Sequence, residues 1–164
     1  MSYSIFISIS QQTLRVISNE HNSAMQTRCY SVSSGLNGGG CEKDSGKTPL
    51  GLHQVRAKIG HNLPINTVFV GRRATGEIFD ERLALSHPQR DWILSRILWL
   101  SGKEIGVNRL GNVDSMQRYI YIHGTPDSEP MGRPLSHGCI RMRNDDLIEL
   151  FDLIEPGTEV MITP

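Results

Sequence analysis

Hydrophobic and polar residues alternate along the first part of the chain. Isoleucines occupy every second position from Ile5 to Ile9, and similar alternation recurs further on. A period of two places successive side chains on opposite faces of a β-strand. We therefore predict strands at residues 3–9, 13–18 and 24–32. Shorter runs of the same kind predict further strands, at residues 52–59, 67–70 and 77–79.

Three apolar segments of the second half predict further elements. Residues 92–100 carry apolar side chains on both alternating faces, which fits a buried strand and is also compatible with a helix. Residues 118–124 predict a short strand with His123 near its carboxyl end, and residues 158–164 predict a last strand. Because no repeat or low-complexity segment is found, we expect one domain over residues 1–164.

The clearest helix is predicted at residues 144–154. Asn144 can cap its first turn, where Asp145 and Asp146 are favourable because a helix N-terminus is electrically positive. One face of this helix is apolar, and it is formed by Leu147, Ile148, Leu150, Phe151 and Ile154. One clear helix among many strands predicts a fold that is mainly β, with one or few short helices.

Composition and charge exclude several classes of protein. Hydrophobic residues make up 38% and charged residues 21% of the chain, which fits a soluble globular domain. The net charge is +0, so the chain lacks the basic surface that drives nucleic-acid binding, and no apolar run is long enough to insert into a membrane. No signal peptide is recognisable, so we expect a cytoplasmic location; a removed leader would instead imply the periplasm.

The cysteines predict free thiols. Cys29, Cys41 and Cys139 are widely spaced and odd in number, which does not fit a disulfide framework. Cys29 lies in a strand-like run, so we expect it to fill the core.

Residues 33–51 are rich in glycine and small polar residues and predict a loop. The tripeptide Gly46-Lys47-Thr48 matches the end of a phosphate-binding loop. Pro49 follows it, however, and disfavours the helix that such a loop must open. A surface loop or the rim of an active site is therefore the favoured interpretation.

Seven residues near the C-terminus bring together groups suited to nucleophilic catalysis; they are His123, Gly124, Ser136, His137, Gly138, Cys139 and Arg141. A thiol is a strong nucleophile only as thiolate, which needs a nearby base or positive charge. In an extended segment His137 shares a face with Cys139, and His123 ends a separate strand. The amides around Gly138 can form an oxyanion site. Arg141 offers a forked cation for a substrate carboxylate.

Each of these residues also has a simpler interpretation. A lone cysteine or histidine is usually structural, and an arginine beside them is usually a solvated charge. His123, His137 and Cys139 could also supply three zinc ligands with an open fourth position, although no Glu is placed as a general base. Their combination in loop-like segments at strand ends favours catalysis, because functional residues collect on such loops.

The segments "IHGT" (residues 122–125) and "SHGCIRM" (residues 136–142) together resemble the signature of the L,D-transpeptidase catalytic (YkuD) family. The resemblance extends to the opening hairpin "SIFISISQQTLRVIS", the turn "KTPLG" and the closing "DLIELFDLIEPGTEVMI". It implies a YkuD-like β-sandwich and cysteine acyl transfer on peptidoglycan stem peptides, with no cofactor and no metal.

The resemblance also implies roles for the reacting groups. Cys139 is expected to be the nucleophile and His123 the base, with the backbone carbonyl of Gly124 orienting the imidazole. His137 and Gly138 are expected to line the oxyanion site.

Two further positions are expected to bind substrate. Arg141 would contact it directly, and Ser136 would make a substrate contact or a structural hydrogen bond. The loop between His123 and Ser136 is a little shorter than the usual family pattern, and Arg141 stands where asparagine is common. These departures bear on the shape of the donor loop and on substrate contact, and they leave the reaction class unchanged.

The implied chemistry leaves the acyl acceptor open. The thiol attacks the L,D link between diaminopimelate and D-Ala, and the thioester then passes to water or to an amine. Because no leader is recognisable, we expect a cytoplasmic L,D-carboxypeptidase that trims stem peptides or muropeptides in murein recycling. The alternative is a periplasmic L,D-transpeptidase that cross-links peptidoglycan. A catalytically silent wall-peptide or zinc-binding protein is the second alternative, and the sequence predicts no oligomeric state.

Overall fold

A computed structural model describes residues 2–20 and 27–164, whose strands form one sheet of ten. The strands are β1 (Tyr3–Ser8), β2 (Thr13–Ser18), β3 (Arg28–Ser33), β4 (Gly51–Ile59), β5 (Thr67–Val70), β6 (Arg73–Ile78), β7 (Ile93–Gly102), β8 (Tyr121–Thr125), β9 (Ile140–Arg143) and β10 (Glu159–Thr163). The helices are α1 (Glu81–Ser86), the 3₁₀ helix η1 (Gly111–Val113) and α2 (Asn144–Leu153).

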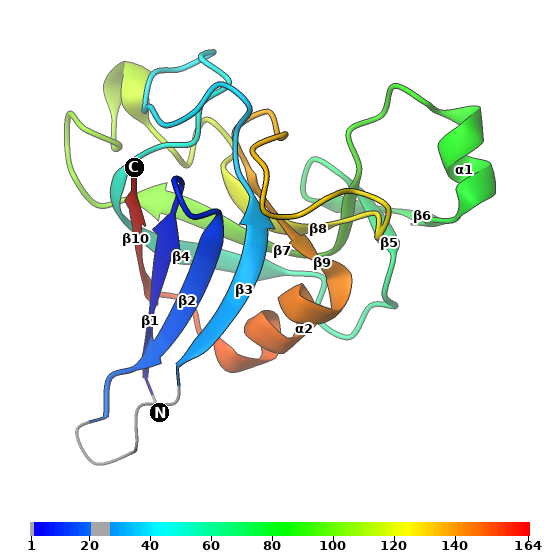
Figure 1. Ribbon diagram of the computed structural model, residues 1–164, viewed down its shortest axis with the longest axis horizontal. Coiled ribbons are helices and arrows are strands. Elements are labelled where there is room, and N and C mark those ends of the chain that lie inside the picture. Colours follow the sequence, from blue (N-terminus) through cyan, green and yellow to red (C-terminus); the bar gives the residue numbers. More distant parts are fainter. Residues whose placement is uncertain (1, 21–26) are drawn as a thin grey trace.

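The sheet closes on itself. Its strand order is β4-β10-β1-β2-β3-β9-β8-β7-β5-β6, and β4 pairs with β7 as well, so β5 and β6 extend outward from a closed ring. The pairs β1–β10 and β8–β9 are parallel, and the other strand pairs are antiparallel. Figure 1 shows β5, β6 and α1 on the side of the molecule away from β1 and β2. The prediction of a mainly β, sandwich-like fold is confirmed.

The ring encloses the main hydrophobic core. Alternate residues of β1, β2 and β10 point into it, among them Ile5, Leu14 and Val160. Helix α2 packs against β7, β8 and β9, and its fully buried side chains are Leu147, Leu150 and Phe151, followed by Ile154 just beyond its end. Burying each such side chain contributes about 1.5–3 kcal/mol. Helix α2 thus supports from the core side the strands that carry the site described below.

Most strands occur where alternation predicts them. The predictions at residues 13–18 and 67–70 are confirmed with the same bounds, and residues 92–100 fall largely in strand β7. Residues 94–98 are all buried, so both faces of β7 are packed and alternation is absent. The predicted strand at residues 24–32 appears as β3, and residues 24–26 of that prediction lie outside the described residues.

Three local predictions are wrong. The strand predicted at residues 118–124 begins only at Tyr121, because Tyr119 lies in a turn with a φ of 57°. Asn144 is the first residue of α2 rather than its cap. Its buried side chain instead forms hydrogen bonds with Ser95 of β7 and Thr125 of β8. Cys29 is exposed, because β3 turns Tyr30 and Val32 toward the core. In the described part of the chain, no helix is long and apolar enough to cross a membrane.

Candidate active site

The parallel strands β8 and β9 place the predicted histidine and cysteine on neighbouring segments of the sheet. They pair in parallel, with Ile122 opposite Ile140 and His123 opposite Arg141. Ile122 and Ile140 point into the core, so His123 and Arg141 face the other side of the sheet. Cys139 directly precedes β9 and lies two residues before Arg141, which places it toward the same face. A thiol and an imidazole from separate segments therefore share one surface.

The imidazole of His123 is held by its neighbour. Its Nδ1 lies 2.6 Å from the carbonyl oxygen of Gly124, and the residue is only 1% exposed. A carbonyl oxygen only accepts hydrogen bonds, so Nδ1 carries the proton and Nε2 keeps a free lone pair. Burial lowers the pKa of His123, against the opposing effects of the Gly124 carbonyl and Asp91. The ring is thus neutral at pH 7 and able to accept a proton.

The strand end that carries His123 is itself fixed by α2. The Asn144 side chain accepts a hydrogen bond from the hydroxyl of Ser95 at 2.7 Å and donates to the carbonyl of Thr125 at 2.9 Å. A side chain at Gly124 would collide with Asn144 and with the backbone of Leu94, so only glycine fits there. The sequence predicted a helix cap at Asn144, whereas in the structure its side chain connects α2 to strands β7 and β8.

The Cys139 thiol rests in a neutral state. Its Sγ donates to the carbonyl of Tyr119 at 3.3 Å and accepts from the amide of Tyr121 at 3.4 Å. Burial raises the pKa of Cys139 to about 11, although the Tyr121 amide acts in the opposite direction. Because the imidazole is also neutral, a base must accept the thiol proton for Sγ to act as a strong nucleophile.

The turn before Cys139 is tied down by polar contacts. The Ser136 hydroxyl donates to the Cys139 carbonyl at 2.6 Å and accepts from the Gly138 amide at 3.1 Å. The Thr48 hydroxyl donates to the Gly138 carbonyl at 2.9 Å. Ser136 therefore makes the structural hydrogen bond that was one of its two expected roles. The Gly138 amide is already engaged, so the expected oxyanion site is left with the amides of His137 and Cys139, which have no protein acceptor among the described residues.

Asp91, which the sequence did not single out, joins the predicted residues. Its carboxylate accepts from Arg141 Nη2 at 3.0 Å and lies 3.3 Å from His137 Nδ1. Burial opposes ionisation of Asp91, but His123, Arg141 and His137 outweigh it and lower the pKa of this carboxyl. The Arg141 side chain is 11% exposed and also lies 3.9 Å from Glu129, so its guanidinium is held by protein carboxylates. No sequence signal marks Asp91, because the chain fold alone brings it here.

A hollow of about 290 Å³ opens at the thiol; its lining includes Lys43, Asp44, Gln117, Arg118, His137 and Cys139. The loop at residues 33–51 contributes Lys43, Asp44 and Gly46 to this lining, which fits its interpretation as the rim of the candidate site. Arg118 fastens this loop by donating to the carbonyl of Lys47 at 2.6 Å. Arg118 was not predicted, since a single arginine between predicted elements carries no distinctive pattern.

The zinc interpretation finds no support in the geometry. Within residues 2–20 and 27–164, no group of three or more histidine, cysteine or acidic side chains could hold a metal ion. His123 Nδ1 is occupied by the Gly124 carbonyl, and His137 Nδ1 faces Asp91.

Curated proteins that match part of this chain are named as putative or probable L,D-transpeptidases. A putative L,D-transpeptidase, YqjB, from Bacillus subtilis is 52% identical over 42 residues, which make up 26% of this chain and 24% of that protein. The probable L,D-transpeptidase ErfK/SrfK from Escherichia coli is 49% identical over 45 residues, or 27% of this chain and 14% of its own length. The matched segments thus span about a quarter or less of these curated relatives.

Solved structures share the fold at low sequence identity. L,D-transpeptidase 3 from Mycobacterium tuberculosis superposes with a TM-score of 0.57 at 18% identity, covering 99% of this chain and 61% of that one. Bd1075 from Bdellovibrio bacteriovorus gives a TM-score of 0.59 at 20% identity, covering 98% of this chain and 47% of that one. The family model for the L,D-transpeptidase catalytic domain, YkuD, matches residues 2–162. Nearly the whole chain is matched, and it therefore belongs to the YkuD family of L,D-transpeptidase catalytic domains.

Proposed function

We propose that this protein is a cysteine acyl transferase that opens the L,D link of peptidoglycan stem peptides and passes the acyl group to an amine on a second stem. The observation that carries the proposal is that Cys139, which lines a hollow, and the Gly124-bound His123 are placed toward the same face of the sheet. The names of the relatives, which are L,D-transpeptidases, support the amine as acceptor.

The first half of the reaction forms a thioester. Sγ of Cys139 attacks the carbonyl carbon between diaminopimelate and D-Ala, and the thiol proton passes to Nε2 of His123. The oxyanion that forms is stabilised by the amides of His137 and Cys139. The bond from carbon to nitrogen breaks, His123 returns the proton to the leaving amine, and D-Ala departs.

The second half transfers the acyl group. A neutral amine of the acceptor stem attacks the thioester carbon, and its excess proton passes to Nε2 of His123. A bond from carbon to nitrogen forms, the bond from carbon to sulfur breaks, and His123 protonates the leaving Sγ of Cys139. The product is a cross-linked dimer, and the enzyme regains its neutral thiol and imidazole.

The hollow at Cys139 has charges that suit an acidic donor peptide. Arg118 and Lys43 line it together with one acidic residue, Asp44, and Arg118 lies close enough to influence the Cys139 thiol electrostatically. A donor stem carries carboxylates on its terminal D-Ala and on its diaminopimelate side chain, and cations pair with carboxylates most strongly when partly shielded from water. Arg141 is less suited to this task than the sequence suggested, because Asp91 holds it.

Hydrolysis is the competing outcome. The prediction of a cytoplasmic L,D-carboxypeptidase in murein recycling rests on the start of the sequence alone, and it stays a prediction. The same thioester serves both outcomes, so product analysis separates them.

The test is to incubate the purified protein with the free tetrapeptide and to identify products by mass spectrometry. We expect a cross-linked dimer together with released D-Ala. Tripeptide and D-Ala without dimer would replace the proposed transferase with a hydrolase. Absence of D-Ala release would overturn both.

A further inference from the structure

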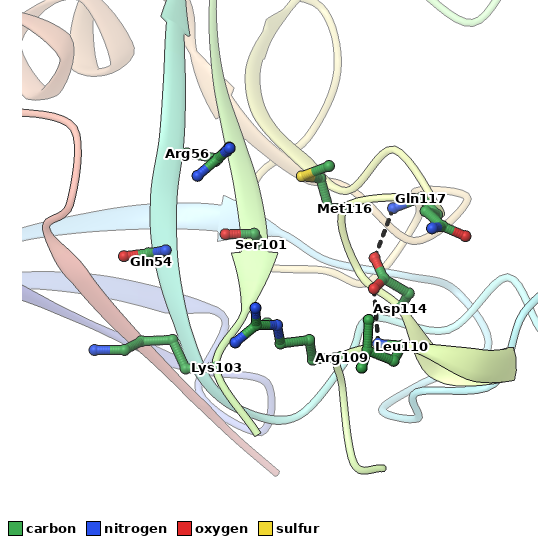
Figure 2. Close-up of a pocket in the computed structure, with 10 residues that line it drawn as sticks. Gln54, Arg56, Ser101, Lys103, Arg109, Leu110, Asp114, Met116 and Gln117 are labelled. Atoms are coloured by element: carbon green, nitrogen blue, oxygen red, sulfur yellow. Dashed lines mark hydrogen bonds between the residues drawn. The ribbon is translucent and has the colours of Figure 1, made fainter. Parts of the chain in front are cut away.

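A second hollow lies on the same face of the sheet, away from the thiol. Its volume is about 320 Å³, and its lining includes Gln54 and Arg56 of β4, Ser101 of β7, and Lys103 and Arg109 from the loop that follows β7. Figure 2 shows the Arg109 side chain extending from that loop toward the end of β7. We name this feature the basic hollow. Its size is that of a site for a short peptide or a small molecule.

Strand register connects the basic hollow with the reacting groups. On β7, Ile97 lies opposite His123 of β8, and Trp99 lies opposite Tyr121. Ser101, two residues after Trp99, therefore points to the same face. Across the other edge of β7, Gln54 pairs with Ser101. A continuous row of side chains thus runs along one face from the imidazole to the basic hollow.

The two hollows share one lining residue. Gln117 lines both the hollow at Cys139 and the basic hollow. Its backbone amide donates to Asp114 at 2.9 Å, and the amide of Leu110 donates to the same carboxylate at 2.7 Å. Figure 2 shows these two bonds. The backbone of the shared residue Gln117 is thus held in position by Asp114.

The lining of the basic hollow contains more cationic than anionic side chains. Lys103 pairs with Glu159 at 2.8 Å, but Arg56 and Arg109 have no carboxylate partner among the described residues. The lining carboxylate of Asp114 is engaged by two backbone amides. Two unpaired guanidinium groups beside the polar side chains of Gln54 and Ser101 suit a peptide that carries carboxylates.

We propose that the basic hollow binds the free carboxylates of the acyl-acceptor peptide while the donor peptide occupies the hollow at Cys139. This inference rests on the proposed function, since a transfer between two stems needs two adjoining peptide sites. The hollow with the nucleophile takes the donor, and the adjoining basic hollow takes the acceptor. The acceptor amine belongs to a diaminopimelate side chain, and the acceptor peptide carries carboxylates on both sides of the point of attack.

The test separates acylation from transfer. The double variant Arg56→Gln, Arg109→Gln removes both free cations, and Arg15→Gln, Arg73→Gln is the matched control with exposed arginines elsewhere. Intact-mass spectrometry measures the rate of acylation by the tetrapeptide, and product analysis measures the ratio of dimer to hydrolysed tripeptide. In the Arg56, Arg109 variant we expect acylation within about twofold of wild type and a dimer ratio lowered at least about tenfold, because charged hydrogen bonds are lost. An unchanged ratio, or an equal fall in acylation, would overturn the acceptor site.

A binding measurement keeps the two proposals distinguishable. Cys139→Ala protein is titrated with the diaminopimelate tripeptide, and amide NMR shifts are followed at Gln54 and Ser101. We expect saturable shifts that are lost when Arg56→Gln and Arg109→Gln are added. Absent shifts would overturn the acceptor site even if acylation is normal. Normal shifts with no acylation of the wild-type protein would overturn the proposed function alone.

Discussion

The barrel built from β1, β2 and β10 and the loop-rich end around Cys139 are held together by different forces. In the barrel, Ile5, Leu14 and Val160 are buried against other apolar side chains. At the loop-rich end, side-chain to backbone hydrogen bonds fix the chain, as between Thr48 and the Gly138 carbonyl. Apolar burial is a non-directional force, whereas hydrogen bonds have preferred distances and angles. The barrel thus supplies stability, and the polar end supplies the placement of the reacting groups.

The largest expected effect is on catalysis at the polar end. His123→Ala removes the proton acceptor, so we expect the rate of acylation by the tetrapeptide to fall at least about 100-fold, the usual scale for a general base. The exposed His87 provides the control, and His87→Ala should acylate at the wild-type rate. A His123→Ala rate close to wild type would mean that another group accepts the thiol proton.

In the barrel the corresponding effect is on stability. Leu14 is fully buried, so Leu14→Ala should lower the free energy of unfolding by about 2–5 kcal/mol, as large-to-small core substitutions do. Its neighbour Arg15 is exposed, and Arg15→Ala should change that free energy by less than about 0.5 kcal/mol. Urea denaturation measures both values. Equal losses of unfolding free energy in the two variants would contradict the assignment of Leu14 to the core and of Arg15 to the surface.

Removing one hydroxyl tests whether a hydrogen bond positions the turn before Cys139. Thr48→Val keeps the shape but deprives the Gly138 carbonyl of a donor and the Gly35 amide of an acceptor. We expect a loss of about 1–3 kcal/mol in unfolding free energy and slower acylation by the folded protein. Thr27→Val, at an exposed threonine, is the control. Unchanged acylation in Thr48→Val would contradict the positioning role of this contact.

The smallest effect expected is a shift in pH dependence. The acid limb of acylation should lie below pH 6.5, because burial lowers the pKa of His123 from that ordinary value. The negative charge of Asp91 raises the pKa of His123, so Asp91→Asn should move the acid limb to still lower pH. Acylation rates between pH 4 and pH 8 measure this, with Asp145→Asn as the exposed control. A shift to higher pH would show that Asp91 acts on another group.

The same division explains what the sequence could predict. Alternation identified β1 and β2 because one face of each meets the core and the other meets solvent. It could not decide on β7, which is buried on both faces, or find α1, which has no buried residue. Asp80 caps α1 by accepting from the Leu83 amide at 2.8 Å, and this aspartate followed by Glu81 in the first turn was the available signal.

At the site, the sequence identified residues by local spacing and missed those placed by the fold. His123 and Cys139 stood out because they sit in short segments with a specific pattern. Asp91 and Arg118 come from other parts of the chain, and their contacts with Arg141 and Lys47 depend on how loops cross. The catalytic roles carried over from the resemblance remain predictions until they are measured.

The most direct measurement is the intact mass of the protein after brief exposure to the tetrapeptide. We predict an increase equal to the tripeptide acyl group, located by peptide mapping on Cys139 and absent from a folded Cys139→Ala variant. An adduct that persists in Cys139→Ala, or that maps to Cys29 or Cys41, would contradict the assignment of Cys139 as the nucleophile.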